Sequence, residues 1–68
     1  MEGILRMILG KLYLENSGKT MEIRPHTRLE IWNGSNWDKV TIIKKGDSFI
    51  FKEYPYMTVT NKRAALIR

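Results

Sequence analysis

The chain contains no cysteine, which excludes a disulfide-stabilised scaffold and a zinc site with cysteine ligands. It has a single histidine, His26, so metal sites built from several histidines and most nucleophile–base triads are excluded as well. No apolar run approaches the roughly 18 residues that a membrane-spanning helix needs. We therefore expect no metal, no other cofactor and no membrane association, and we interpret the chain as a cytoplasmic protein.

Length and composition describe one small folded unit. The 68 residues, 43% of them hydrophobic, suffice for a single core but leave no room for a separate catalytic domain. No repeat, low-complexity tract or linker interrupts the chain, so we interpret residues 1–68 as one domain. The acidic residues are scattered singly, without the local pairs that suggest acid–base catalysis. We expect a protein that is not an enzyme.

The excess of basic residues is concentrated in the second half of the chain. Twelve lysines and arginines stand against seven acidic residues, which gives a net charge of +5 at pH 7. Residues 35–68 hold seven of the basic and three of the acidic residues, whereas residues 1–34 hold five and four. This distribution is typical of domains that bind polyanions, although small domains also carry net charge for solubility alone.

Short segments rich in β-branched and aromatic residues alternate with turn signals along the chain. The turn signals lie at Asn16-Ser17-Gly18, Arg24-Pro25-His26, Asn33-Gly34-Ser35-Asn36, Lys45-Gly46-Asp47, Tyr54-Pro55 and Asn61. The pattern predicts an all-β fold, either a small SH3-like barrel or a rolled antiparallel sheet of five to six short strands, because closure hides exposed strand edges. The one helical element that we expect is a single turn over residues 61–65.

A hairpin is predicted around the four-residue loop 33–36, with Trp32 opposite Trp37. Side chains alternate between the two faces of a strand. The side chains expected in the core are Leu29, Ile31, Val40 and Ile42. Those expected on the opposite face are Arg28, Glu30, Trp32, Trp37, Lys39 and Thr41. This register turns only one charged residue of the hairpin, Asp38, toward the core.

Four further segments are predicted to contribute inward-facing side chains to the core, namely residues 11–15, 49–51, 57–59 and 65–67. Leu12 and Leu14 share one face of the strand that residues 11–15 are expected to form. Residues 49–51 form another predicted strand, with either both phenylalanines or Ile50 turned inward. About a dozen apolar side chains are then buried, which is near the minimum for stability at this size.

A series of short motifs extends over most of the chain. The motifs are Gly3-Ile4-Leu5, Lys11-Leu12-Tyr13-Leu14, Leu29-Glu30-Ile31-Trp32, Gly34, Trp37, Val40-Thr41-Ile42 and the closing segment Leu66-Ile67-Arg68. Together they resemble an uncharacterised family of short proteins encoded on plasmids, conjugative elements and prophages of Gram-positive bacteria. Residues 25–28 and 49–51 depart from the family pattern. The family has no established activity, so the resemblance implies an accessory protein of a mobile element and no particular mechanism.

Trp32 and Trp37 are the first candidate binding residues. On the outer face of a basic sheet, beside Arg28 and Lys39, two indoles are suited to stack on nucleic-acid bases or to fill a pocket of a protein partner. The alternative is that one or both indoles fold over the end of the barrel and close the core. Tyr54, in a rigid proline-containing loop, either extends this aromatic surface or packs on the core.

Basic residues near the predicted loops form a second set of candidates. They are Lys44, Lys45, Lys52, Lys62, Arg63 and Arg68. If these loops share one end of the barrel, their side chains form a phosphate-binding rim. The alternative is that they are solvated lysines and arginines that prevent pairing between exposed strand edges.

The favoured hypothesis is a module that binds DNA or RNA with little sequence specificity. The residues expected to carry it are Arg28, Trp32, Trp37, Lys39, Lys44, Lys45, Tyr54, Lys62 and Arg63. An alternative is a protein-binding accessory or inhibitor, for example a phage anti-defence protein that acts on a host nucleic-acid enzyme. A homodimer that buries the exposed aromatic side chains is a third possibility.

Overall fold

The computed structural model describes residues 1–67 and confirms the predicted all-β fold. Within these residues there are seven strands, one more than the upper limit expected from the sequence. The strands are β1 (Glu2–Ile8), β2 (Lys11–Asn16), β3 (Lys19–Ile23), β4 (Arg28–Trp32), β5 (Trp37–Lys45), β6 (Ser48–Phe51) and β7 (Arg63–Leu66). The first 23 residues alone fold into three strands joined by two tight turns, which accounts for the higher number.

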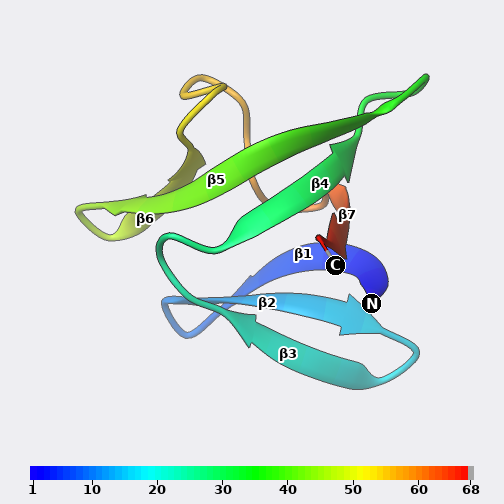
Figure 1. Cartoon of the computed structure of the whole chain (residues 1–68). Helices are drawn as coiled ribbons and strands as arrows, with labels where there is room; N and C mark the ends of the chain where they lie inside the picture. Colours follow the sequence, from blue (N-terminus) through cyan, green and yellow to red (C-terminus); the bar gives the residue numbers. More distant parts are fainter. Residues whose placement is uncertain (68) are drawn as a thin grey trace.

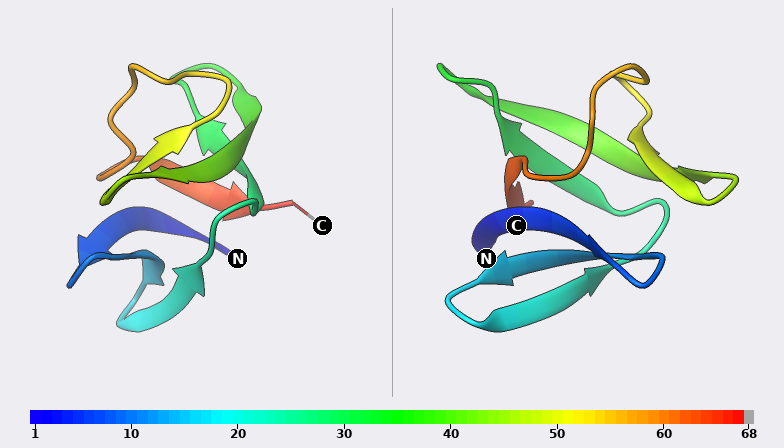
Figure 2. Two further views of the ribbon diagram at one scale, coloured as in Figure 1. Left: turned by 90° about the vertical axis from the view of Figure 1, so that its left-hand side faces the viewer. Right: turned by 180° about the vertical axis from the view of Figure 1, so that it is seen from behind.

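All strand pairings are antiparallel, and the order in the sheet is β3-β2-β1-β7-β4-β5-β6. The last strand, β7, therefore lies between β1 and β4 and joins two groups of three consecutive strands. Figures 1 and 2 show these groups one above the other, with β7 connecting them. Strands β3 and β6 are the edges, and no pairing between them closes the sheet within residues 1–67. The fold is a rolled antiparallel sheet.

The core lies on the inner face of the rolled sheet. It consists of Leu5, Leu12, Leu14, Ile23, Leu29, Ile31, Val40, Ile42, Phe51, Val59 and Ala64. Leu12 and Leu14 share the buried face, as their alternation predicts. In β6 the phenylalanines turn inward, because Phe51 is fully buried and Phe49 packs against the core.

The hairpin of β4 and β5 has the predicted register. Its pairs are Trp32 with Trp37, Ile31 with Asp38, Glu30 with Lys39, Leu29 with Val40 and Arg28 with Thr41. Asn33 organises the loop, because its side-chain oxygen accepts hydrogen bonds from the backbone N–H groups of residues 35 and 36. Asp38 is half-buried, and its carboxylate accepts a hydrogen bond of 2.9 Å from the Asn33 amide.

The prediction of a helical turn over residues 61–65 is wrong. Arg63–Leu66 instead form β7, which pairs with β1 on one side and with β4 on the other. Ala64 is fully buried between these strands, and the hydrogen bonds to both neighbours outweigh the weak helix propensity of the segment. The closing strand thus begins earlier than the family resemblance implies, and Arg68 lies outside the described residues. No helix capable of crossing a membrane occurs in residues 1–67.

Strand β1 approaches β2 closely at Gly3. A side-chain carbon at this position would collide with the backbone carbonyl of Glu15. Beside it, the Asn16 side-chain amide donates a hydrogen bond of 2.6 Å to the Glu2 carbonyl oxygen. Because β1 pairs with β2 through Ile4–Ile8 and with β7 through its first residues, glycine allows the strand to pass from one partner to the other. Gly3 thereby helps to place Glu2 beside β7.

Candidate functional site

The strand pairing brings two adjacent rows of side chains together on the surface that points away from the core. Neighbouring strands lie roughly 4.8 Å apart, so each row crosses β5, β4, β7 and β1 at this spacing. The first row contains Trp37, Trp32, Arg63 and Ile4. The second row contains Lys39, Glu30, Ala65 and Glu2. This surface is called the outer face below.

Trp32, Trp37 and Arg63 contact one another in the first row and are called the indole–guanidinium cluster. The two indoles meet edge to face, with ring centroids 5.5 Å apart and ring planes at 61°. The Arg63 guanidinium carbon lies 5.9 Å from the centroid of Trp32 and 5.6 Å from that of Trp37, within the range of cation–π attraction. Trp32 is 37% exposed and Trp37 is half-buried. Neither indole is enclosed in the core.

Glu2 holds Arg63 from the side of β1. The guanidinium Nε and an Nη of Arg63 both contact the same Glu2 carboxylate oxygen. Because these two side chains are 54% and 45% exposed, the ion pair contributes little to the free energy of unfolding. Its consequence is geometric, since it extends the contacts of the cluster to β1. Residues 61 positions apart in the chain are therefore joined at this site.

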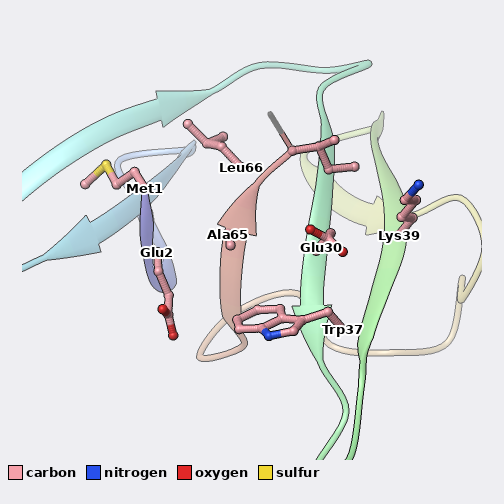
Figure 3. Close-up of a pocket in the computed structure, with 8 residues that line it drawn as sticks. Met1, Glu2, Glu30, Trp37, Lys39, Ala65 and Leu66 are labelled. Carbon is pink, nitrogen blue, oxygen red and sulfur yellow. The ribbon is translucent and has the colours of Figure 1, made fainter.

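A hollow of about 600 Å³ opens over Ala65, beside the cluster (Figure 3). Its lining consists of Met1, Glu2, Glu30, Trp37, Lys39, Ala65, Leu66 and Ile67. The short side chain of Ala65 leaves the floor low between Glu2 and Glu30, which pair with it from the strands on either side. Figure 3 shows the Trp37 indole extending across β4 toward β7 and bounding one end of the hollow. The Lys39 amine points away from Glu30.

Arg28 lies further along the outer face, opposite Thr41. The Glu53 carboxylate accepts hydrogen bonds from the Thr41 backbone N–H at 2.7 Å and from its hydroxyl at 3.0 Å. Desolvation acts to raise the pKa of Glu53, but these hydrogen bonds, one from its own backbone N–H and the Arg28 charge together hold that pKa below its usual value. The charge of Arg28 is thus partly balanced by Glu53.

Lys44 and Lys45 do not join Lys62 and Arg63 in one rim, so the phosphate-binding rim proposed from the sequence is not formed. The two lysines end β5, seven and eight residues beyond Trp37, which corresponds to roughly 25 Å along a strand. Figure 1 shows the β5–β6 turn at the opposite end of β5 from the β4–β5 loop. Strand β7 starts beside the end of β4, because the two strands are antiparallel, so Arg63 lies near Trp37 instead.

Lys62 and Tyr54 take part in other contacts. Lys62 is half-buried, and its carbonyl oxygen accepts a hydrogen bond of 2.9 Å from the Leu5 backbone N–H. The Tyr54 hydroxyl donates to the Asp38 carboxylate at 3.5 Å. Because Asp38 belongs to the inward-facing residues of β5, Tyr54 lies on the other side of that strand from Trp37. Tyr54 does not extend the aromatic surface of the indoles.

Alternation along the hairpin predicts that Arg28, Trp32, Trp37 and Lys39 share one face, and the pairing of β4 with β5 confirms this. The sequence pattern did not predict the parts of the site that β7 and β1 supply. These parts are the position of Arg63 over both indoles, its contact with Glu2 and the hollow over Ala65. No local pattern in the sequence marks them, since they depend on pairing between the two ends of the chain.

Comparisons with known proteins give no further assignment. No protein-family model, curated protein or solved structure matches this chain. In the part of the chain that the structure describes, no three histidine or acidic side chains are placed to hold a metal ion. The site is therefore interpreted from its own geometry, as an aromatic and cationic cluster beside a hollow that carries two carboxylates.

Proposed function

We propose that the protein binds single-stranded nucleic acid through the indole–guanidinium cluster, with low sequence specificity. The observation that carries this proposal is the position of Arg63 within 6 Å of both indole centroids on an exposed sheet face, at 5.9 and 5.6 Å. Aromatic side chains stack on unpaired bases, which is worth about 1–3 kcal/mol per base. Guanidinium groups add stacking and bidentate phosphate contacts. A single strand is favoured because its base faces are accessible, unlike those of a duplex.

The net charge of the chain supports a polyanionic ligand. On the outer face, Arg28, Lys39 and Arg63 are matched in number by Glu53, Glu30 and Glu2. The excess of positive charge belongs to the chain as a whole, which carries +5. The Lys39 amine points away from Glu30 (Figure 3), so it is well placed to contact a phosphate next to a stacked base. Such contacts release counterions and make the affinity depend on salt.

Tryptophan fluorescence tests this proposal directly, because both tryptophans of the chain lie in the cluster. Titration with an oligothymidylate at about 50 mM salt should change the emission and reach saturation. If three phosphates are neutralised, the logarithm of the affinity should fall with the logarithm of the salt concentration with a slope of about −2. Emission that stays constant, or an affinity that does not vary with salt, would contradict the proposal.

A second candidate function is binding of a protein partner, favoured by two exposed apolar side chains. Leu9 is 98% exposed in the β1–β2 turn and has a φ of +50°, and Tyr56 is fully exposed. The left-handed backbone conformation costs an L-residue about 1–2 kcal/mol. Leu9 therefore neither packs in the core nor has a backbone conformation that favours the turn. In this second proposal, Leu9 and Tyr56 are the side chains that a partner covers.

Light scattering distinguishes a homodimer from a monomer, and Leu9→Asn tests whether any self-association uses this turn. Retention of a host protein after nuclease treatment would favour a different partner. Under either function we propose a non-enzymatic, cytoplasmic accessory protein of a mobile element, on the basis of the sequence features and the family resemblance.

A further inference from the structure

The hollow over Ala65 is lined by two carboxylates, which do not suit a phosphate ligand. Two carboxylates flank its floor, and that of Glu2 is engaged with Arg63. Among residues 1–67, neither a hydrogen-bond donor nor a cationic side chain contacts the carboxylate of Glu30. Glu30 thus offers two acceptor oxygens to a ligand in the hollow. A phosphate would be repelled there, whereas a group with N–H donors would be attracted.

Trp37 supplies an aromatic wall next to these oxygens. Glu30 pairs with Lys39 and Trp32 pairs with Trp37, so Glu30 and Trp37 are diagonal neighbours whose Cβ atoms lie roughly 7 Å apart. A flat ring that packs against the indole can therefore bring its edge to the Glu30 carboxylate. The net charge of +5 on the chain favours a ring carried by an anionic molecule over a cationic side chain of a protein.

We infer that the hollow accepts a guanine base, which donates its N1–H and N2–H groups to the Glu30 carboxylate while its ring packs against Trp37. This inference rests on the proposed function and names the base preferred at one position. A carboxylate accepts two parallel hydrogen bonds, and guanine is the common base with two adjacent donors on its Watson–Crick edge. Adenine and cytosine present one donor next to an acceptor, which the carboxylate repels. Uracil and thymine place one donor between two acceptors.

The test compares thymidine pentanucleotides in which only the central base varies: guanine, hypoxanthine, adenine or cytosine. Hypoxanthine differs from guanine only in lacking the N2 amino group, so this comparison needs no protein variant. Tryptophan fluorescence at low salt should show that the guanine oligonucleotide binds about tenfold more tightly than the others. A ribonucleotide series and GMP alone distinguish DNA, RNA and a free nucleotide as the source of the base.

Two variants locate the preference. Glu30→Gln should abolish it, because an amide offers one acceptor and one donor in place of two acceptors. Glu22→Gln makes the same change of charge on the exposed part of β3, away from the hollow, and should retain the preference for guanine.

Loss of the guanine preference in Glu30→Gln but not in Glu22→Gln would support the inference. Equal affinities for guanine and hypoxanthine, with binding retained, would overturn it and leave the proposed function standing. A preference that persists in Glu30→Gln would also overturn it. Failure of all oligonucleotides to bind would overturn both proposals, and binding of an arginine-rich peptide instead would assign the hollow to a protein ligand.

Discussion

The two ends of β5 hold their charged and aromatic side chains in different ways. At its first residue, Trp37 contacts Trp32 of β4 and Arg63 of β7, and an ion pair extends these contacts to Glu2 of β1. At its other end, lysines precede the β5–β6 turn, and the turn that carries the exposed Leu9 lies on the same side of the molecule (Figures 1 and 2).

The comparison distinguishes a surface assembled from four strands from a local contact within one hairpin. Side chains that already contact one another lose less conformational entropy when a ligand binds. Lys44 has a cation–π contact of its own within the β5–β6 hairpin, with its amine 5.9 Å from the centroid of Phe49. The two lysines can attract a polyanion over a distance, but no contact among residues 1–67 links them to the indoles. Under the proposed function, the outer face recognises the ligand and the turn attracts it over a distance.

The largest expected effect separates these two roles. Replacing Trp32 and Trp37 together by alanine should lower the affinity for an oligonucleotide about a hundredfold, because two stacked bases lose about 1–3 kcal/mol each. Replacing Lys44 and Lys45 together by glutamine should lower it only a few-fold and reduce its salt dependence. Fluorescence anisotropy of a labelled oligonucleotide measures both. A larger loss from the lysine variant would reverse the assignment.

Substitution of two glycines compares the two ends of β1. Gly3→Ala should destabilise the protein by about 2 kcal/mol, because the added carbon meets the Glu15 carbonyl in a closely packed site. Gly10→Ala, at the β1–β2 turn, has open space around the added carbon and should cost only about 1 kcal/mol through its positive φ. Urea unfolding followed by tryptophan emission measures both free energies. Equal losses would mean that the close approach at Gly3 does not limit the structure.

Leu9→Gly should stabilise the protein by about 1 kcal/mol, because glycine adopts the left-handed conformation of this turn at lower cost. Its affinity for oligonucleotides should equal that of the original protein, since Leu9 lies outside the outer face. Urea unfolding and the anisotropy assay check the two statements. A loss of oligonucleotide affinity in this variant would show that the turn, too, takes part in binding.

The smallest expected effect concerns acid pH. The pKa of Glu53 in the folded protein lies below the ordinary value of 4.5, so its ionised form stabilises the fold above that pH. This contribution is lost as the pH falls through the folded-state pKa. The difference in unfolding free energy between the original protein and Glu53→Gln should therefore shrink at acid pH. A difference that stays constant between neutral and acid pH would exclude this role for the carboxylate.

Local patterns were sufficient to predict the central hairpin. Alternation of apolar and polar residues around the loop at 33–36 fixes which side chains of β4 and β5 turn inward, because a shift by one residue would bury the charges. The register of Trp32 with Trp37 follows from the length of the loop. The all-β class follows in the same way from short segments separated by turn residues.

The position of β7 and the parts of the site that depend on it follow from long-range strand pairing, which could not be predicted from the sequence. Residues 61–65 include two alanines and two basic residues, which locally favour a helical turn. Residues 63–66 form β7 instead because they pair with β1 on one side and with β4 on the other. Arg63 reaches the indoles as a result of that pairing, and Ala65 forms the floor of the hollow for the same reason. The distance between Lys44 and Arg63 likewise depends on where β7 enters the sheet.

Nuclear magnetic resonance of the labelled protein tests the central claim most directly, because it observes both ends of β5 in one titration. On addition of a single-stranded oligonucleotide, the two indole Nε1–H signals and the Arg63 Nε–H signal should shift together and reach saturation. The backbone signals of Lys44 and Lys45 should shift much less. Saturating shifts confined to the β5–β6 turn, with the indole signals unchanged, would contradict the account.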